Sequence, residues 1–359
     1  MEESDLAALS ARLMPRVDEL AVEMARRIRA AEPDLAVVSE EGVIASCAEQ
    51  LRTSLAHLGG AAGPTEAAQA NARRRAHLGV PLAALLHSYR IGTQFLWECI
   101  AAEAPAENAI LIESAGELWL GLDQLSETIR VSYREAEAER ELRDRLEHDR
   151  LFDALLGTDL LRIRTAADGL GLPQRGRFHV VAAPAAAQIP AAAVQRHLPT
   201  EQLAVLSLPD AAPFPRLEGG RFGVSPAYDQ ISQTASALRL ARLALAAVPP
   251  GIEDACHYGD RPVATLIASN PETADDLTRR ILVRLLDLPR EEREALFTTA
   301  RAWYATGSTA AAAKALFCHR NTVNYRLSKL QELTGRSVRH PAEAAELFFV
   351  LETVSLQGL

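Results

Sequence analysis

The stretch that decides the fold of the C-terminal end is STAAAAKALFCHRNTVNYRLSKLQELTG, residues 308–335. Ser308 can cap a helix over residues 309–317, whose alanines permit close approach by a neighbouring helix. After a short turn at Cys318-His319, residues 323, 327, 330 and 334 fall on one face of a second helix, which Gly335 ends. The stretch therefore predicts two helices joined by a tight turn, preceded by a helix over residues 290–306 that stops at Gly307.

The opposite face of the second helix carries hydrogen-bonding side chains. At about 100° per residue, the residues that point away from the apolar face are Asn321, Asn324, Tyr325 and Ser328, with Thr322 and Lys329 at its flank. In a recognition helix, Asn321, Asn324 and Tyr325 are candidates for base contacts, since Asn can pair with adenine through two hydrogen bonds. The candidates for phosphate contacts are Arg320, Arg326 and Lys329, and Ser308 and Thr309 complete the candidate DNA-binding set.

Charge is distributed unevenly along the chain. The net charge of −9 taken alone argues against a nucleic-acid partner. Residues 301–340, however, hold seven basic side chains and one acid, which gives +6 locally; they are Arg301, Lys314, Arg320, Arg326, Lys329, Arg336 and Arg339 against Glu332. A basic module on an acidic body favours DNA binding.

The sequence of this helix-turn-helix stretch resembles that of a known family. Residues 311–327, AAAKALFCHRNTVNYRL, followed by Leu333-Thr334-Gly335, resemble the C-terminal helix-turn-helix of the PucR/CdaR family of bacterial transcription regulators. That resemblance implies binding to double-stranded operator DNA, usually as a homodimer or higher homo-oligomer, and an upstream domain that responds to a small-molecule effector. The alternative is a partner-switching signalling protein that uses this domain only for protein contacts, since helix-turn-helix corners also occur in ordinary bundles. DNA affinity that falls steeply with salt separates the two functions.

Residues 5–132 are predicted to form a helical sensor domain. Apolar residues recur three and four apart at positions 6, 9, 13, 17, 20 and 24. Breaks at 32–34, 59–64, 79–81 and around Pro105 predict a bundle of about five or six helices. Residues 75–92, with Trp97 and Glu98, are similar to the helical sensing domains of the RsbR type, which implies a globin-like bundle.

Residues 133–150 are predicted to form a charged connecting helix. A thin apolar stripe of Val131, Ala138, Leu142 and Leu146 fits either a short two-stranded coiled coil or a solvated single helix.

Residues 151–265 are predicted to form a small α/β domain. Alternating segments at 178–183, 202–208 and 220–225 indicate strands, and 190–197 and 228–247 indicate helices. Residues 223–226 and 237–245 resemble the GGDEF-like central domain of the same family, which implies a degenerate cyclase-type fold. A DNA-binding domain over 270–359 completes a mainly α, multidomain chain.

We expect no catalytic activity, metal or cofactor. An active cyclase needs clustered carboxylates for Mg²⁺, and the acids between 178 and 226 are only Glu201, Asp210 and Glu218. The haem-ligand candidates are His57, His77 and His87, but a lone His among Ala and Leu is more often a surface residue. The run 73–75 of arginines could bind an anionic effector, although a solvated helix face is the commoner fate of such charges. No cofactor-binding residue is assigned, and Cys318 is given no redox role.

Length and cysteine use bound the class of protein. At 359 residues the chain exceeds what one core usually serves. Four cysteines without a CxxC pair favour a reducing compartment, and neither a basic apolar leader nor a run of about 18 apolar residues occurs. We therefore expect a cytoplasmic regulator without membrane contact.

Overall fold

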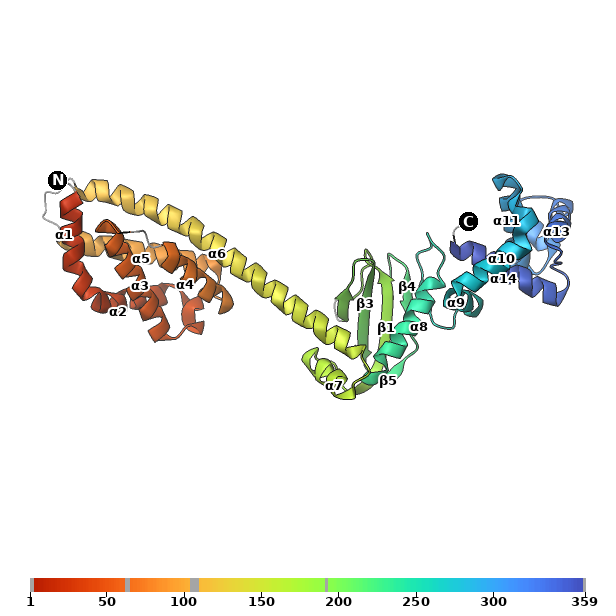
Figure 1. Cartoon of the computed structure of the whole chain (residues 1–359), viewed down its shortest axis with the longest axis horizontal. Helices are drawn as coiled ribbons and strands as arrows, with labels where there is room; N and C mark the ends of the chain where they lie inside the picture. Colours follow the sequence, from red (N-terminus) through yellow and green to blue (C-terminus); the bar gives the residue numbers. More distant parts are fainter. Residues whose placement is uncertain (1–2, 62–64, 104–109, 191–192, 358–359) are drawn as a thin grey trace. The chain divides into compact units, whose positions relative to one another are not determined.

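The computed structural model describes residues 3–61, 65–103, 110–190 and 193–357. The chain divides into two compact units, residues 1–147 and residues 148–359. Figure 1 shows that the first unit is helical and that the second combines a sheet with helices. Among the described helices, none combines the length and the apolar composition that a membrane span requires. The predicted fold class, mainly α with a small α/β part, is confirmed.

The first unit is a bundle of helices. Its elements are α1 (Glu3–Leu13), the 3-10 turn η1 (Met14–Arg16), α2 (Val17–Ala31), η2 (Pro33–Val37), α3 (Glu40–Leu58), α4 (Thr65–His77), α5 (Leu82–Glu103) and most of α6 (Ile110–Leu155). The predicted breaks at 32–34, at Gly59 and at 79–81 are confirmed, while Pro105 lies outside the described residues. Leu9, Leu13, Val17, Leu20 and Met24 are buried as their spacing predicts.

The arginine run at the end of α4 is split between surface and interior. Arg73 and Arg74 are exposed and pair with Glu135 and Glu49 at 3.5 and 3.2 Å. Arg75 is only 5% exposed and donates to the Ser46 hydroxyl at 2.9 Å and to a backbone carbonyl. The expectation of a wholly solvated run is therefore wrong for Arg75, whose burial lowers the pKa of its guanidinium.

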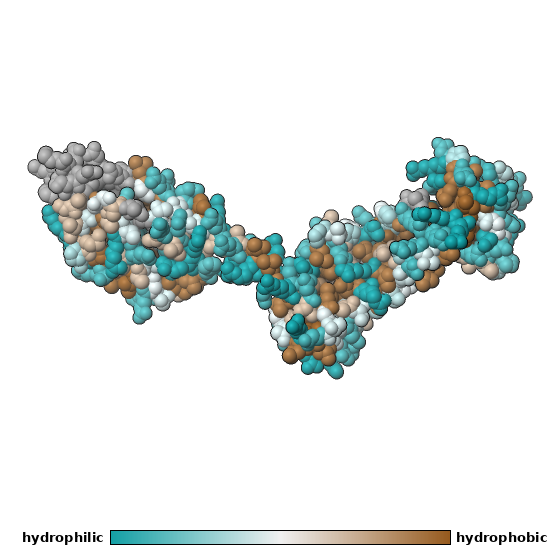
Figure 2. Space-filling view, in the orientation of Figure 1, coloured by the Kyte–Doolittle hydropathy of each residue, from teal (hydrophilic) through white to brown (hydrophobic). Residues whose placement is uncertain are grey.

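The connecting segment lies within the single helix α6. Tyr133 is buried and its hydroxyl donates to the Val80 carbonyl at 2.8 Å, so this part of α6 packs on the bundle. Every residue from 137 to 147 is exposed. Leu142 and Leu146 are 56% and 49% exposed there, and Figure 2 shows brown atoms on a mainly teal helix. Within one chain this stretch is a solvated single helix.

The second unit begins with a mixed sheet. After α7 (Leu160–Gly169) come β1 (Arg175–Pro184), β2 (Val194–His197), β3 (Glu201–Leu208), β4 (Phe222–Val224), β5 (Tyr228–Gln230), the 3-10 turn η3 (Ile231–Gln233), α8 (Thr234–Ala246) and β6 (Ala255–His257). The strand order is β2-β3-β1-β4-β6, with β5 also paired to β1. All pairs are antiparallel except β4 with β6.

The predicted strands are confirmed, and one predicted helix is wrong. Residues 178–183 and 202–208 lie within β1 and β3, and residues 220–225 contain β4. Of the helix expected over 190–197, residues 194–197 form instead the edge strand β2, in which Val194 pairs with Val205 of β3. The helix expected over 228–247 starts only at Thr234, after β5 and η3. Pairing with β3 has overridden the local pattern from which a helix was expected.

Both faces of the sheet are buried. Along β1, Phe178, Val180 and Ala182 contribute to a core shared with α7 and α8, whereas Val181 and Ala183 point to the other side. On the α8 side, β4 approaches the helix so closely that a Cβ on Gly223 would overlap the Ala241 carbonyl oxygen and the Leu245 nitrogen. Gly223 is thus required by a close approach of two backbones.

The C-terminal part of the unit is helical. It comprises α9 (Pro262–Ser269), α10 (Pro271–Leu286), α11 (Arg290–Thr306), α12 (Thr309–Ala315), α13 (Arg320–Thr334) and α14 (Pro341–Gln357). Their shared core includes Leu285, Phe297, Ala312, Leu330 and Val350, one residue from each of α10 to α14.

The last helix, α14, belongs to two clusters. Leu347, Val350 and Val354 lie in the core with α11–α13, while Leu356 packs against Ala244, Val248 and Ala264 of the α8–α9 region. Glu352 pairs with Arg261 at 3.4 Å, and Arg261 also donates to the Ala247 carbonyl at 2.9 Å. The α/β part and the C-terminal helices are therefore joined by direct contacts within the second unit.

Candidate nucleic-acid interface

The C-terminal ends of α11 and α13 lie where the local sequence predicts them. α11 ends at Gly307, whose φ is 67°, and α13 ends at Gly335, also at 67°. The Ser308 hydroxyl accepts the Ala311 N–H at 3.5 Å and caps α12. The helix predicted over residues 309–317 is two residues too long, since α12 ends at Ala315 and not at Phe317.

The turn before α13 is capped by a side chain. The Nδ1 atom of His319 accepts the backbone N–H of Asn321 at 3.2 Å. The turn at Cys318-His319 is thus capped by a ring nitrogen, which His can provide when that nitrogen carries no proton. The cap fixes the start of α13, and buried Val323, Leu327 and Leu330 fix which face points inward.

Part of the predicted DNA-binding set lies free on the outer face of α13. Arg320, Asn321 and Ser328 are exposed, and Tyr325 is 65% exposed. Thr322 is half-buried at the flank. At the start of α12, Ser308 is exposed and Thr309 is half-buried. The outer face therefore presents a cation, an amide, a phenol and a hydroxyl side by side on one helix.

Three other predicted residues are held by the domain itself. Arg326 donates to the Thr299 hydroxyl of α11 at 3.3 Å, and the carbonyl oxygen of the Asn324 side chain accepts from Arg339 at 3.2 Å. Lys329 forms an ion pair with Glu292, and this hydrogen bond raises the pKa of the lysine. Of the three predicted phosphate ligands, only Arg320 is exposed and without a partner within the described residues.

The local excess of positive charge is smaller in space than along the chain. Besides Lys329, Arg336 pairs with Glu346, which raises the pKa of that guanidinium. Both acids lie outside the window 301–340 and reach it only through packing of α11 and α14. The exposed cations Lys314 and Arg320 remain at the end of α12 and at the start of α13.

Sequence reasoning missed Phe317. This residue is 98% exposed and has a φ of 52°, the left-handed region that favours glycine. It was expected to be the last residue of a helix and lies instead in the turn. The available signal was its place two residues before His319, in the segment that joins the two helices.

The histidines considered for haem and the acids considered for cyclase chemistry are exposed or form ion pairs. His57, His77 and His87 are all exposed. Glu201 pairs with Arg242, and Glu218 pairs with Arg216 at 2.9 Å. Across the part of the chain that the structure describes, no three His, Cys, Asp or Glu side chains cluster as metal ligands would.

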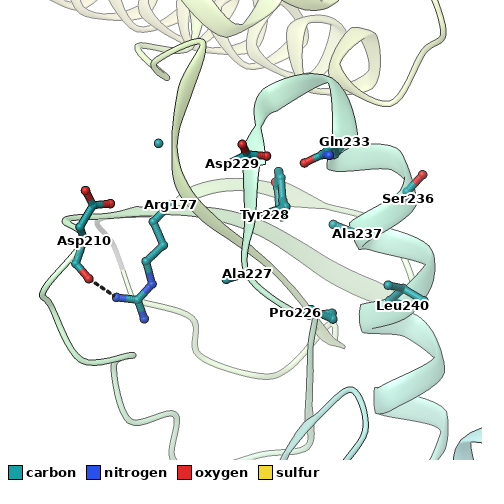
Figure 3. A pocket seen from close by; sticks show the side chains of 11 residues that line it. Arg177, Asp210, Pro226, Ala227, Tyr228, Asp229, Gln233, Ser236, Ala237 and Leu240 are labelled. Atoms are coloured by element: carbon teal, nitrogen blue, oxygen red, sulfur yellow. Dashed lines mark hydrogen bonds between the residues drawn. The ribbon is translucent and has the colours of Figure 1, made fainter.

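A cavity of about 650 Å³ lies between β5, the start of α8 and the loop at Asp210. Figure 3 shows the Arg177 guanidinium turned to the loop, where it donates to the carbonyls of Asp210 at 3.1 Å and Ala212 at 2.6 Å. The Arg177 guanidinium is thus already hydrogen-bonded to the loop backbone. The cavity offers a carboxylate at Asp229 and a hydroxyl at Ser236.

The comparisons with known proteins concern both ends of the chain. Residues 18–148 match the RsbT co-antagonist protein rsbRD N-terminal domain, and residues 296–353 match the PucR C-terminal helix-turn-helix domain. No curated protein matches the chain. Among solved structures, the regulator of polyketide synthase expression from Bifidobacterium adolescentis is similar, with 20% identity, a TM-score of 0.29 and coverage of 60% of this chain and 95% of that one.

The two family matches coincide with the two helical parts described above. The first spans α2 to the exposed stretch of α6, and the second spans α11 to α14. The chain therefore combines an RsbRD N-terminal domain with a DNA-binding helix-turn-helix domain of the PucR type.

Proposed function

We propose that this protein is a sequence-specific transcription regulator of the PucR/CdaR type, with a sensor domain over 5–132, a connecting helix, an α/β domain over 151–265 and a DNA-binding domain over 270–359. The observation that carries the proposal is the outer face of α13, where Arg320, Asn321 and Tyr325 are exposed on a helix whose other face is anchored in the core. Such a face fits the major groove. The regulator acts in the cytoplasm, where its operator DNA is.

Regulation is proposed to act on the spacing of two recognition helices. In a homodimer, half-sites one helical turn apart require the two α13 helices to lie about 34–36 Å apart. An effector that binds one arrangement better than another shifts the population between them, and so changes operator affinity. Half-sites at another spacing in a footprint would contradict this geometry.

The first test is binding to DNA from upstream of the gene for this protein and of neighbouring genes, across a salt series. We expect affinity to fall steeply with salt, and Arg320→Ala to reduce the log–log slope by about one because one phosphate contact is lost. Lys329→Ala is the matched control. Its charge is already paired with Glu292, so we expect a clearly smaller change in slope.

Wild-type protein that binds no fragment at low salt contradicts the proposal and favours the partner-switching function. Equal slopes for wild type and Arg320→Ala contradict only the assignment of Arg320.

The cavity beside α8 is the proposed effector site. Its volume lies in the range of small-molecule sites, and its free polar groups suit a ligand that donates hydrogen bonds. We expect the small-molecule fraction of a cell extract to change the DNA affinity of the wild type and not that of Ser236→Trp, whose indole would occupy part of the cavity and obstruct a ligand. An equal response of both proteins places the effector elsewhere.

A further inference from the structure

Three helices of the C-terminal domain end in a left-handed residue. α11 and α13 use Gly307 and Gly335, both at a φ of 67°. α12 uses Phe317, at 52°. Only glycine adopts this backbone region without a steric cost, so the helix-turn-helix carries a costly residue at the position where its neighbours carry the favourable one.

The backbone around Phe317 forms a Schellman cap. The Cys318 N–H donates to the Ala313 carbonyl at 3.0 Å, and the Phe317 N–H donates to the Lys314 carbonyl at 3.3 Å. These are the two hydrogen bonds of that motif, and both come from the backbone. The partly buried Cys318 packs in the core next to the cap, as the residue after the left-handed position commonly does. The cap therefore has no use for the Phe317 ring.

The Phe317 ring also does not pack against the rest of the domain. At 98% exposure it buries no apolar surface, although an aromatic side chain can bury 150–250 Å² when it packs. A residue that raises the energy of the backbone and contributes nothing to the core is explained by something that the ring contacts outside the domain.

The surroundings of Phe317 point to DNA. It lies between the exposed cations Lys314 and Arg320, and it is three residues from Arg320, which places the two Cα atoms within about 11 Å. Within residues 308–335 the only other exposed large apolar side chain is Tyr325. A protein partner needs a contiguous apolar patch, whereas a single ring flanked by cations fits a groove edge bordered by phosphates.

We propose that Phe317 is a specificity-determining residue that contacts the C5-methyl group of a thymine at the edge of the half-site read by α13. Apolar side chains recognise thymine in the major groove through this methyl group. The left-handed backbone aims the ring outward at the N-terminal end of α13, the end that enters the groove. The inference rests on the proposed DNA-binding function and names one further element of its sequence recognition.

The test uses Phe317→Gly in the full chain, with the tightest-bound fragment of the upstream DNA as the probe. This variant removes the ring and also the left-handed strain. We expect about tenfold weaker binding to that fragment, unchanged binding to unrelated DNA, and hydrogen exchange in α11–α13 that is unchanged or slower. Leu266→Ala, which removes a 67% exposed side chain from α9, is the control and is expected to change neither measurement.

The thymine is identified by replacing each thymine of the fragment with deoxyuridine, which lacks only the methyl group. We expect one position in each half-site at which the wild type loses affinity and Phe317→Gly shows no further loss. Equal loss of Phe317→Gly on specific and unrelated DNA, faster exchange in α12–α13, or unchanged affinity each overturns the inference. Unchanged DNA affinity with lost transcriptional control assigns the ring to a protein partner instead. Failure of the proposed function is separate, because then the wild type binds no fragment at low salt.

Discussion

Asn321→Ala is expected to weaken binding to the specific DNA fragment by about 1–3 kcal/mol, roughly 5- to 150-fold, and to spare binding to unrelated DNA. The Asn321 side chain is exposed at the end of α13 that enters the groove, with both its oxygen and its nitrogen available to an adenine. Its backbone N–H, and not its side chain, bonds to the His319 cap, so the substitution leaves the cap intact. Fluorescence anisotropy titrations on both DNAs measure the two affinities.

The matched control for this prediction is Asn324→Ala. The Asn324 carbonyl oxygen already accepts from Arg339, so this amide is less available for a bidentate pair and its loss is expected to cost less. Tyr325→Ala, which removes a free side chain, is expected to behave like Asn321→Ala. If Asn321→Ala weakens binding to both DNAs by the same factor, the residue does not read a base.

Gly223→Ala is expected to destabilise the α/β domain by about 3 kcal/mol. The added methyl group would occupy the place of two backbone atoms of α8, at Ala241 and Leu245, and a helix backbone cannot move aside as a flexible side chain can. α8 must shift away from the sheet, which opens the core around Phe178. Faster hydrogen exchange in the peptides of β1, β4 and α8 reports the loss.

Gly219→Ala is the control within the same domain. Gly219 has a φ of 74° and open space around it, so alanine there carries only the cost of the left-handed backbone, about 1 kcal/mol. Exchange rates of Gly223→Ala that match those of the wild type would show that β4 and α8 are not held in close contact.

The parts of the fold that could be predicted are those with local causes. The C-terminal ends of α11 and α13 follow from Gly307 and Gly335, each of which directly follows the last residue of its helix. Short apolar runs likewise predict β1 and β3, since these runs consist of consecutive residues.

The parts that could not be predicted depend on residues far apart in sequence. β2 is a strand because it pairs with β3, a partner that the local pattern of residues 190–197 does not show. Lys329 is withdrawn from the candidate phosphate ligands by Glu292, 37 positions earlier. The buried Arg75 side chain has its hydrogen-bond partner in Ser46 of α3. In each case the partner that decides the outcome lies too far away in sequence for a local pattern to reveal it.

α14 contributes residues to two hydrophobic clusters, and this has a mechanical consequence. Its last turn is held by the α8–α9 cluster, and its first turns hold the segment after α13, through Glu343 on the Ser337 N–H at 2.7 Å and through the pair of Glu346 with Arg336. A helix of 17 residues is a stiff rod about 25 Å long, so a tilt of about 5° at one end moves the other by about 2 Å. A tilt of α14 of that size at its α/β end would therefore displace the end of α13 by a distance comparable to the length of a hydrogen bond.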